Sequence, residues 1–165
     1  MKNDFVLINS EDVPQQDFRP IPWVCKFEGS EHNTNNYYSV HWNMPQPRKE
    51  NDGSVGHPPH MHKENEIMML MGTDPTCPDD LGAEVEMCIG EDMVKHVFTK
   101  TCTIIIPGGT PHGNFRIVES KKPWIFVQVQ EANPRTEKFL WDYLTPEQIA
   151  NIAHPELWKD TGFDD

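Results

Sequence analysis

The chain has 165 residues, and its 14 Lys and Arg residues stand against 26 Asp and Glu residues, a formal net charge of −12. This acidity argues against nucleic acid and anionic membrane surfaces as partners, because both recruit basic side chains. The length fits one domain with a core of its own, and a hydrophobic share of 36% argues against a disordered chain.

Residues 1–36 are rich in Asp, Asn, Gln and Pro. They predict an extended arm, with a short strand near residues 21–24, that packs on the rest of the domain or on a dimer partner. The apolar run at residues 5–8 is too short for a secretory signal or a membrane span. The four cysteines form no CxxC pair, which indicates reduced thiols in a cytoplasmic protein.

Between residues 37 and 130 the sequence predicts a series of short strands separated by turns. The clearest alternation lies at residues 83–89, where apolar and acidic side chains take turns. The predicted strands are 37–44, 66–71, 83–89, 94–98, 101–106, 114–118 and 124–130. Strands of this length and spacing indicate an all-β antiparallel sandwich or barrel.

The C-terminal region has the signals of a short helix. Thr145 can cap it, Pro146 stands at its first position, and Gln148 completes a capping box. A further turn is expected at residues 155–159. We therefore expect a helical extension packed outside the sheets.

The segment from His57 to Glu66, HPPHMHKENE, has the most informative composition in the chain. In an extended segment His60 and His62 project to the same face, and Glu66 has the same parity. Two imidazoles and a carboxylate suit Mn, Fe, Co, Ni, Cu or Zn. Ordinary loop histidines are the alternative interpretation of this segment alone.

A second segment, PGGTPH, ends at His112. Its glycines allow a tight turn after the apolar residues 104–106, which would place His112 at the start of the returning strand. If the strands of His60 and His112 are neighbours, His112 supplies a fourth ligand. A structural turn with a hydrogen-bonded histidine is the alternative.

Taken together, HxHxxxE followed by Gly72 and the later PxGxxH run resemble the two motifs of the cupin superfamily. This resemblance implies a double-stranded β-helix, or jelly-roll barrel, over residues 37–133, with residues 134–165 as a C-terminal helical extension of a single domain. It also implies one divalent transition metal per chain, bound by His60, His62, Glu66 and His112. A homodimer is implied as well.

One departure from the family pattern bears on the ligand. Arg116 replaces the Asn that often lies four residues after the last histidine, and Arg can bind a carboxylate or phosphate through two hydrogen bonds. A surface Arg paired with one of the many carboxylates is the alternative. His57 is a candidate proton carrier, or else an exposed loop histidine.

The resemblance implies a metal-dependent enzyme that acts on a small oxygenated metabolite, either neutral or anionic. We favour lyase, isomerase or decarboxylase chemistry in which the metal polarises a substrate oxygen. An iron-dependent dioxygenase is one alternative, and a cupin that binds or senses a small ligand without converting it is another.

Overall fold

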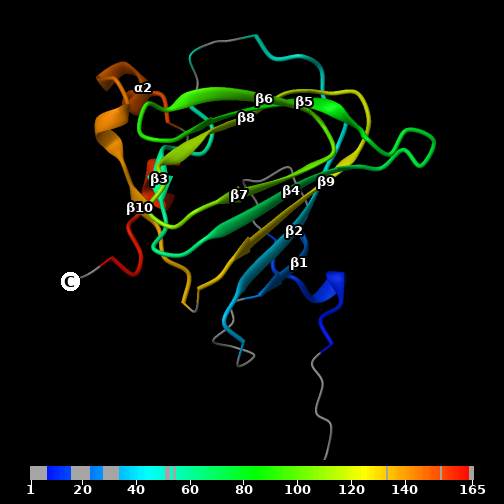
Figure 1. Cartoon of the computed structure of the whole chain (residues 1–165), viewed down its shortest axis with the longest axis horizontal. Helices are drawn as coiled ribbons and strands as arrows, with labels where there is room; N and C mark the ends of the chain where they lie inside the picture. The colour runs from blue at the N-terminus through cyan, green and yellow to red at the C-terminus, as the bar shows by residue number, and fades with distance from the viewer. Residues whose placement is uncertain are drawn as a thin grey trace, which may run out of the picture.

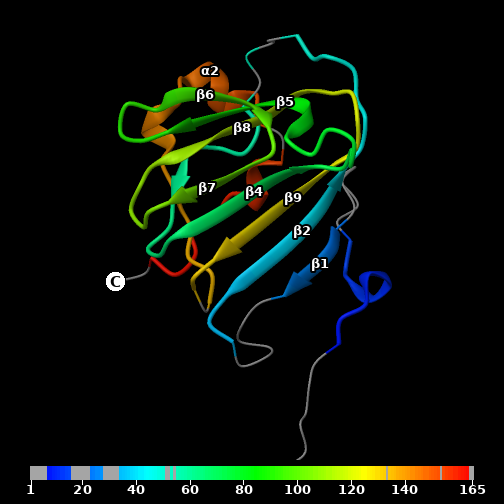
Figure 2. The same ribbon diagram turned by 45° about the vertical axis from the view of Figure 1, so that its right-hand side comes forward.

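Two five-stranded antiparallel sheets face each other in the computed structural model, which describes residues 7–15, 23–27, 34–50, 53, 55–132, 134–152 and 154–163 (Figures 1 and 2). The first sheet has the spatial order β1 (Trp23–Phe27), β2 (Tyr37–Asn43), β9 (Trp124–Gln130), β4 (Glu66–Gly72) and β7 (Cys102–Ile106). The second has the order β10 (Lys138–Phe139), β3 (His60–Met61), β8 (His112–Ser120), β5 (Asp80–Ile89) and β6 (Val94–Lys100). This arrangement confirms the predicted all-β antiparallel barrel.

The alternation of buried and exposed residues along β4 shows why these segments form strands. Glu66, Met68 and Leu70 are buried inside the barrel, while the residues between them face outward. Leu70 packs with Leu81, Val85 and Trp124 in a cluster in which every side chain is fully buried. This apolar cluster is built from both sheets and lies toward the end of β4 away from Glu66.

The predicted strands are confirmed with small shifts of their ends. Two further strands, β3 and β10, were not predicted. β3 and β10 have only two residues each, too few for an alternating pattern. β1 shows that part of the predicted arm is a strand of the first sheet, paired with β2. Residues 1–6, 16–22 and 28–33 of that arm lie outside the described residues.

The C-terminal region is helical, as predicted. The helix α2 (Pro146–Ala150) has a complete capping box between Thr145 and Gln148, and a 3₁₀ turn follows at Pro155–Leu157. These elements lie beside β3 and β10 at one end of the barrel (Figure 1). Buried Leu144 and Ile152 hold them against Val55.

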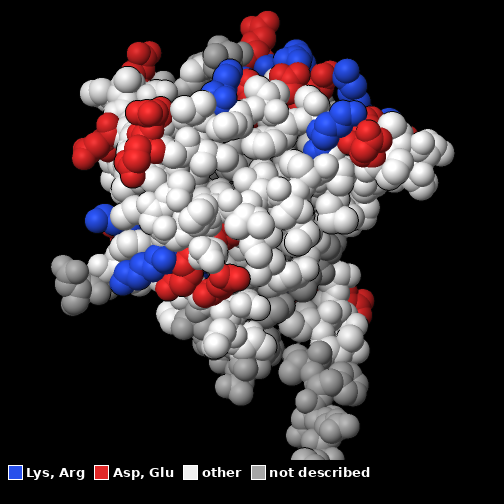
Figure 3. Space-filling view, viewed as in Figure 1, with Lys and Arg blue, Asp and Glu red and all other residues white. Residues whose placement is uncertain are grey.

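The outer face of the first sheet is apolar. Its outward positions on β4 are Ile67, Met69 and Met71, and Ile105 on β7 is 67% exposed. Charged side chains lie mostly at the margins of the molecule in Figure 3, and β4, β7 and β9 cross the middle of the same view in Figure 1. Among the described residues, no helix is long and apolar enough to cross a membrane.

Candidate metal centre

Four side chains from the two sequence motifs meet inside the barrel. His60 lies on β3, His62 follows it, Glu66 begins β4 and His112 begins β8, and all four are buried. One possible ligand atom from each lies within 4.8 Å of the others. We call these residues the four-residue cluster. Its members come together because His60 and His112 are directly paired across β3 and β8.

Each histidine of the cluster is oriented by a hydrogen bond from its Nδ1 atom to a backbone carbonyl. His60 donates to the oxygen of Pro58 at 2.8 Å, and His112 to that of Thr110 at 2.9 Å. His62 donates in the same way to the carbonyl oxygen of Thr136, in the C-terminal extension. With a proton on Nδ1, Nε2 is the ring atom that is left to bind a metal.

Glu66 completes the donor set from the first sheet. Its Oε1 atom accepts a hydrogen bond from Gln128, while Oε2 lies 3.0 Å from Nε2 of His112. These two facing atoms are at ion-pair distance from each other, and neither has another hydrogen-bond partner among the described residues. A bound cation would take the place of this contact and be held by both atoms.

The charges of the cluster suit a divalent cation. Burial raises the pKa of Glu66, but the contacts with His112 and His62 outweigh it and hold this pKa well below the usual range. Burial is the main cause that lowers the pKa of His60, and the neighbouring imidazoles of His57 and His112 lower it further. The imidazole of His60 is therefore neutral. The residues present therefore fit a transition metal with nitrogen and oxygen ligands. Gln130, with its amide nitrogen 2.9 Å from Nε2 of His62, makes a contact that a cation would displace.

A second group of possible ligands, which the sequence did not reveal, adjoins the cluster. Oε1 of Glu137 lies 3.6 Å from Nε2 of His57 and 3.9 Å from Nε2 of His60. Burial raises the pKa of Glu137, although Arg135, at 2.7 Å, opposes this. No sequence pattern marks Glu137, because it lies just before the two-residue strand β10. His57 is half-buried and packs edge-on against Trp158, with ring centroids 4.7 Å apart.

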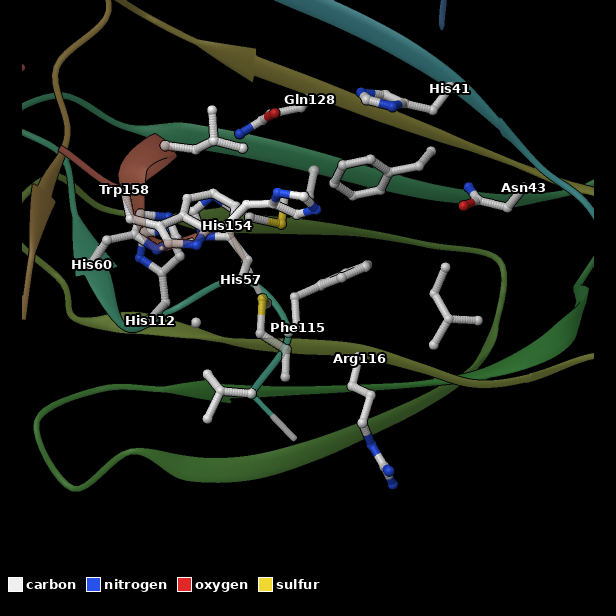
Figure 4. Close-up of a pocket in the computed structure, with 18 of the residues that line it drawn as sticks. His41, Asn43, His57, His60, His112, Phe115, Arg116, Gln128, His154 and Trp158 are labelled. Atoms are coloured by element: carbon white, nitrogen blue, oxygen red, sulfur yellow. Dashed lines mark hydrogen bonds between the residues drawn. The ribbon is translucent and has the colours of Figure 1, made fainter. Parts of the chain in front are cut away.

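Arg116 lines the same cavity, but its guanidinium has protein partners. It lies 3.2 Å from Oε2 of Glu86 and donates to the backbone oxygen of Glu50 at 3.1 Å. In Figure 4 it extends away from His60 and His112. A ligand anion would therefore have to compete with Glu86 for this side chain.

The cluster opens into a cavity of about 650 Å³ between the two sheets. His41, Asn43 and Gln128 lie along one wall, and Phe115 and Arg116 lie across from them (Figure 4). Trp158 and His154 of the C-terminal extension line the end near His60 and His112. A buried donor set beside a cavity of this size is typical of a small-molecule site.

Solved structures share this architecture. An oxalate oxidase in complex with the substrate analogue glycolate matches 90% of this chain and 73% of its own, with 16% identity and a TM-score of 0.50. A point mutant of the oxalate decarboxylase of Bacillus subtilis matches 86% of this chain, with 10% identity and a TM-score of 0.51. The protein has a cupin fold. The predicted family resemblance is thereby confirmed at the level of the fold.

The comparisons also set the extent of this likeness. A conserved protein with a double-stranded β-helix domain from Klebsiella pneumoniae matches 83% of this chain and 92% of its own, with 16% identity and a TM-score of 0.46. The match to the decarboxylase spans only 34% of that longer chain. No family model matches the sequence, and no curated protein matches it significantly.

The close approach of β8 to the segment before β3 can be tested at Gly113. A Cβ atom there would lie 2.6 Å from the carbonyl oxygen of Pro58, which orients His60. We expect Gly113→Ala to lower the free energy of unfolding by about 1–3 kcal/mol more than Gly90→Ala does. Gly90 is the matched control, because its φ is also positive but its added Cβ meets nothing within 4 Å. Chemical denaturation measures both, and equal losses would contradict the expectation.

Proposed function

We propose that this cupin is a metal-dependent enzyme acting on a small oxygenated metabolite, with His60, His62, Glu66 and His112 as the ligands of one divalent transition metal. The convergence of three oriented imidazoles and one ionised carboxylate, all buried, supports the proposal most directly. Mn, Fe, Zn, Ni, Co and Cu all suit this donor set.

When bound, such a metal would polarise a substrate oxygen and stabilise negative charge that develops on it. The protein's own contribution is orientation and exclusion of water. Gln128 holds Glu66, the backbone carbonyls hold the histidines, and Trp158 lines the end of the cavity beside the cluster. His57 is the proposed proton carrier, because its Nε2 lies near the buried carboxyl group of Glu137.

The chemistry that we favour is a lyase, isomerase or decarboxylase reaction. Two of the similar structures are named as an oxalate oxidase and an oxalate decarboxylase. These names support an oxygen-rich substrate, but one names an oxidation and the other a decarboxylation. Arg116 is the proposed contact for an anionic group, which requires it to exchange Glu86 for the ligand. An iron-dependent dioxygenase and a binding protein without turnover are the competing proposals.

Removing one proposed ligand should abolish tight metal binding without unfolding the barrel. We expect His112→Ala and Glu66→Gln each to weaken Co(II) binding by about 100-fold or more. Mutation of a residue that only hydrogen-bonds to a metal ligand already lowers metal affinity by about 10–100-fold. Isothermal titration calorimetry on the metal-free protein measures this. His96→Ala is the matched control, since His96 is exposed on β6. Unchanged affinity in both ligand variants would overturn the proposed site.

The reaction class can be tested by dependence on oxygen. We expect protein loaded with Mn(II), Co(II) or Fe(II) to convert an oxygenated acid equally fast with and without O2, because metal polarisation consumes no oxidant. Product formation and oxygen uptake are measured together over a panel of small hydroxy, keto and dicarboxylic acids. Oxygen uptake in step with turnover of the Fe(II) form would favour the dioxygenase. Binding without conversion of any panel member would favour the binding protein.

We also propose that this cupin forms a homodimer through the apolar outer face of the first sheet. On β4 and β7 this face presents Ile67, Met69, Met71 and Ile105, and no charged side chain occupies these outward positions. Monomeric proteins rarely expose a continuous apolar surface of this kind. A second copy of the same face would cover it.

A lysine in the middle of that face should separate the two chains. We expect Ile105→Lys to convert a dimer into a monomer, because a charge without a partner would be buried at the interface. Light scattering after size-exclusion chromatography gives the mass of each variant. Val94→Lys is the control, since Val94 is 53% exposed on β6 of the other sheet. A wild-type mass of one chain would refute the dimer.

A further inference from the structure

His62 differs from the other two histidines of the four-residue cluster in the residue that orients it. Each of the other two donates from Nδ1 to a carbonyl oxygen two residues before it in the chain. His62 donates instead to the carbonyl oxygen of Thr136, 74 residues farther along. The other histidines are therefore oriented by their own segments, whereas the orientation of His62 depends on the C-terminal extension.

Thr136 contacts the first motif, HxHxxxE, at two points. Its carbonyl oxygen accepts the hydrogen bond from Nδ1 of His62, and its Oγ1 atom accepts one from the backbone N–H of Lys63 at 2.9 Å. The two bonds join one residue of the extension to two consecutive residues of the motif. Such a two-point contact fixes where the carbonyl oxygen lies relative to the backbone of His62, and a fixed acceptor orients the imidazole.

The hydroxyl group of Thr136 is itself held in one orientation. It donates its single hydrogen to Oε2 of Glu64 at 2.9 Å, so a lone pair of Oγ1 is left to accept from Lys63. Thr136 is buried, with 6% of its surface exposed. Loss of the hydroxyl would remove one of the two points of contact and leave the carbonyl acceptor of His62 less well placed.

Backbone pairing holds the extension close to this contact. Phe139 pairs with His60 across β10 and β3. Glu137 and Thr161 form an antiparallel bridge, in which each backbone N–H donates to the other residue's carbonyl oxygen at 2.8 and 2.7 Å. Thr136 directly precedes this bridge, so its position is set by the fold of the extension.

The same extension forms part of the cavity wall. His154 and Trp158 line the cavity at the end near His60 (Figure 4). The contact between Thr136 and His62 therefore connects a proposed metal ligand to the segment that lines this end of the cavity. A change in the position of the extension would reach both the ligand and the wall.

We infer that Thr136 is a positioning residue of the metal centre, which orients His62 from the C-terminal extension and makes metal binding depend on the docking of that extension. This inference rests on the proposed metal site. Coupling between two binding equilibria is reciprocal, so a metal bound at the four-residue cluster must in turn stabilise the docked extension. Thr136 acts through His62 and is not itself a ligand.

Two substitutions of Thr136 in the full chain test the positioning role. We expect Thr136→Val, which replaces the hydroxyl with a methyl group, to weaken Co(II) binding by about tenfold or more, as for other residues that hydrogen-bond to a ligand. Thr136→Ser keeps the hydroxyl and should bind Co(II) nearly as tightly as the wild type. Calorimetry on the metal-free proteins gives the dissociation constants. The visible spectrum of Co(II)-saturated Thr136→Val should also differ from that of the wild type, because the orientation of one imidazole ligand changes.

Thr73→Val is the matched control. The hydroxyl of Thr73 also bonds to the backbone, at the carbonyl oxygen of Pro123 at 2.6 Å, but Thr73 follows β4 at the end away from Glu66. Chemical denaturation measures how much stability each metal-free variant loses, and Co(II) affinity should fall only in Thr136→Val. Equal losses of affinity in the two valine variants would show a general structural effect and overturn the inference.

Hydrogen exchange tests the same coupling in the wild-type protein, where no substitution can prevent folding. We expect saturating Co(II) to slow exchange of the Glu137 and Thr161 amides by about tenfold or more, because bound metal opposes opening of the extension. These amides donate to each other's carbonyls and not to a residue of the cluster. The amides of β6, at the opposite edge of the second sheet from β10, are the reference. Equal slowing in β6, or none in the extension, would contradict the coupling.

The outcomes separate this inference from the proposed function. If the wild-type protein does not bind Co(II), the proposed metal site fails, and the role of Thr136 fails with it. If the wild type binds Co(II) while Thr136→Val binds it equally tightly with an unchanged spectrum, the metal site stands and Thr136 does not position His62.

Discussion

The pairing of His60 with His112 across β3 and β8 is the constraint on which the site depends. It joins two motifs that lie some fifty residues apart in the chain, although β3 itself has only two residues. Backbone carbonyls then accept hydrogen bonds from Nδ1 of each imidazole, which leaves Nε2 as the ring atom that can bind a metal. Because those acceptors belong to the backbone, the fold itself, and not a set of additional side chains, orients the histidines.

The interior of the barrel combines two environments along its strands. Near Glu66 it is polar and ionised, and the contacts with neighbouring histidines offset the cost of burying a carboxylate there. Farther along, Met68 and Phe126 are apolar, while His41, Gln128 and Asn43 add polar groups on the same sheet. Side chains on β2, β4 and β9 point inward at every second residue. Residues that are paired across these strands therefore face the same part of the interior.

The strong negative charge of the chain has little bearing on the site. Acidic side chains are mostly on the outside, and several are paired, as Glu86 is with Arg116 and Lys95. Inside, a single ionised carboxylate of the cluster faces three imidazoles. Net charge therefore excludes classes of macromolecular partner, while the local donor set decides which cation or ligand fits.

The sequence by itself predicted most of the strands and the capped helix, because alternation and a capping box are local signals. The four-residue cluster followed from the resemblance of its two motifs to the cupin superfamily, since each motif alone also fitted an ordinary loop or turn. The sequence did not reveal β3 and β10, which are too short for a pattern, nor Glu137, which reaches His57 only through the pairing of β10 with β3. The sequence also allowed two roles for Arg116, a contact with the ligand or an ion pair with a carboxylate of the protein. Only the tertiary structure placed Glu86 beside it and Asn43 in the cavity, because both depend on pairing between strands distant in the chain.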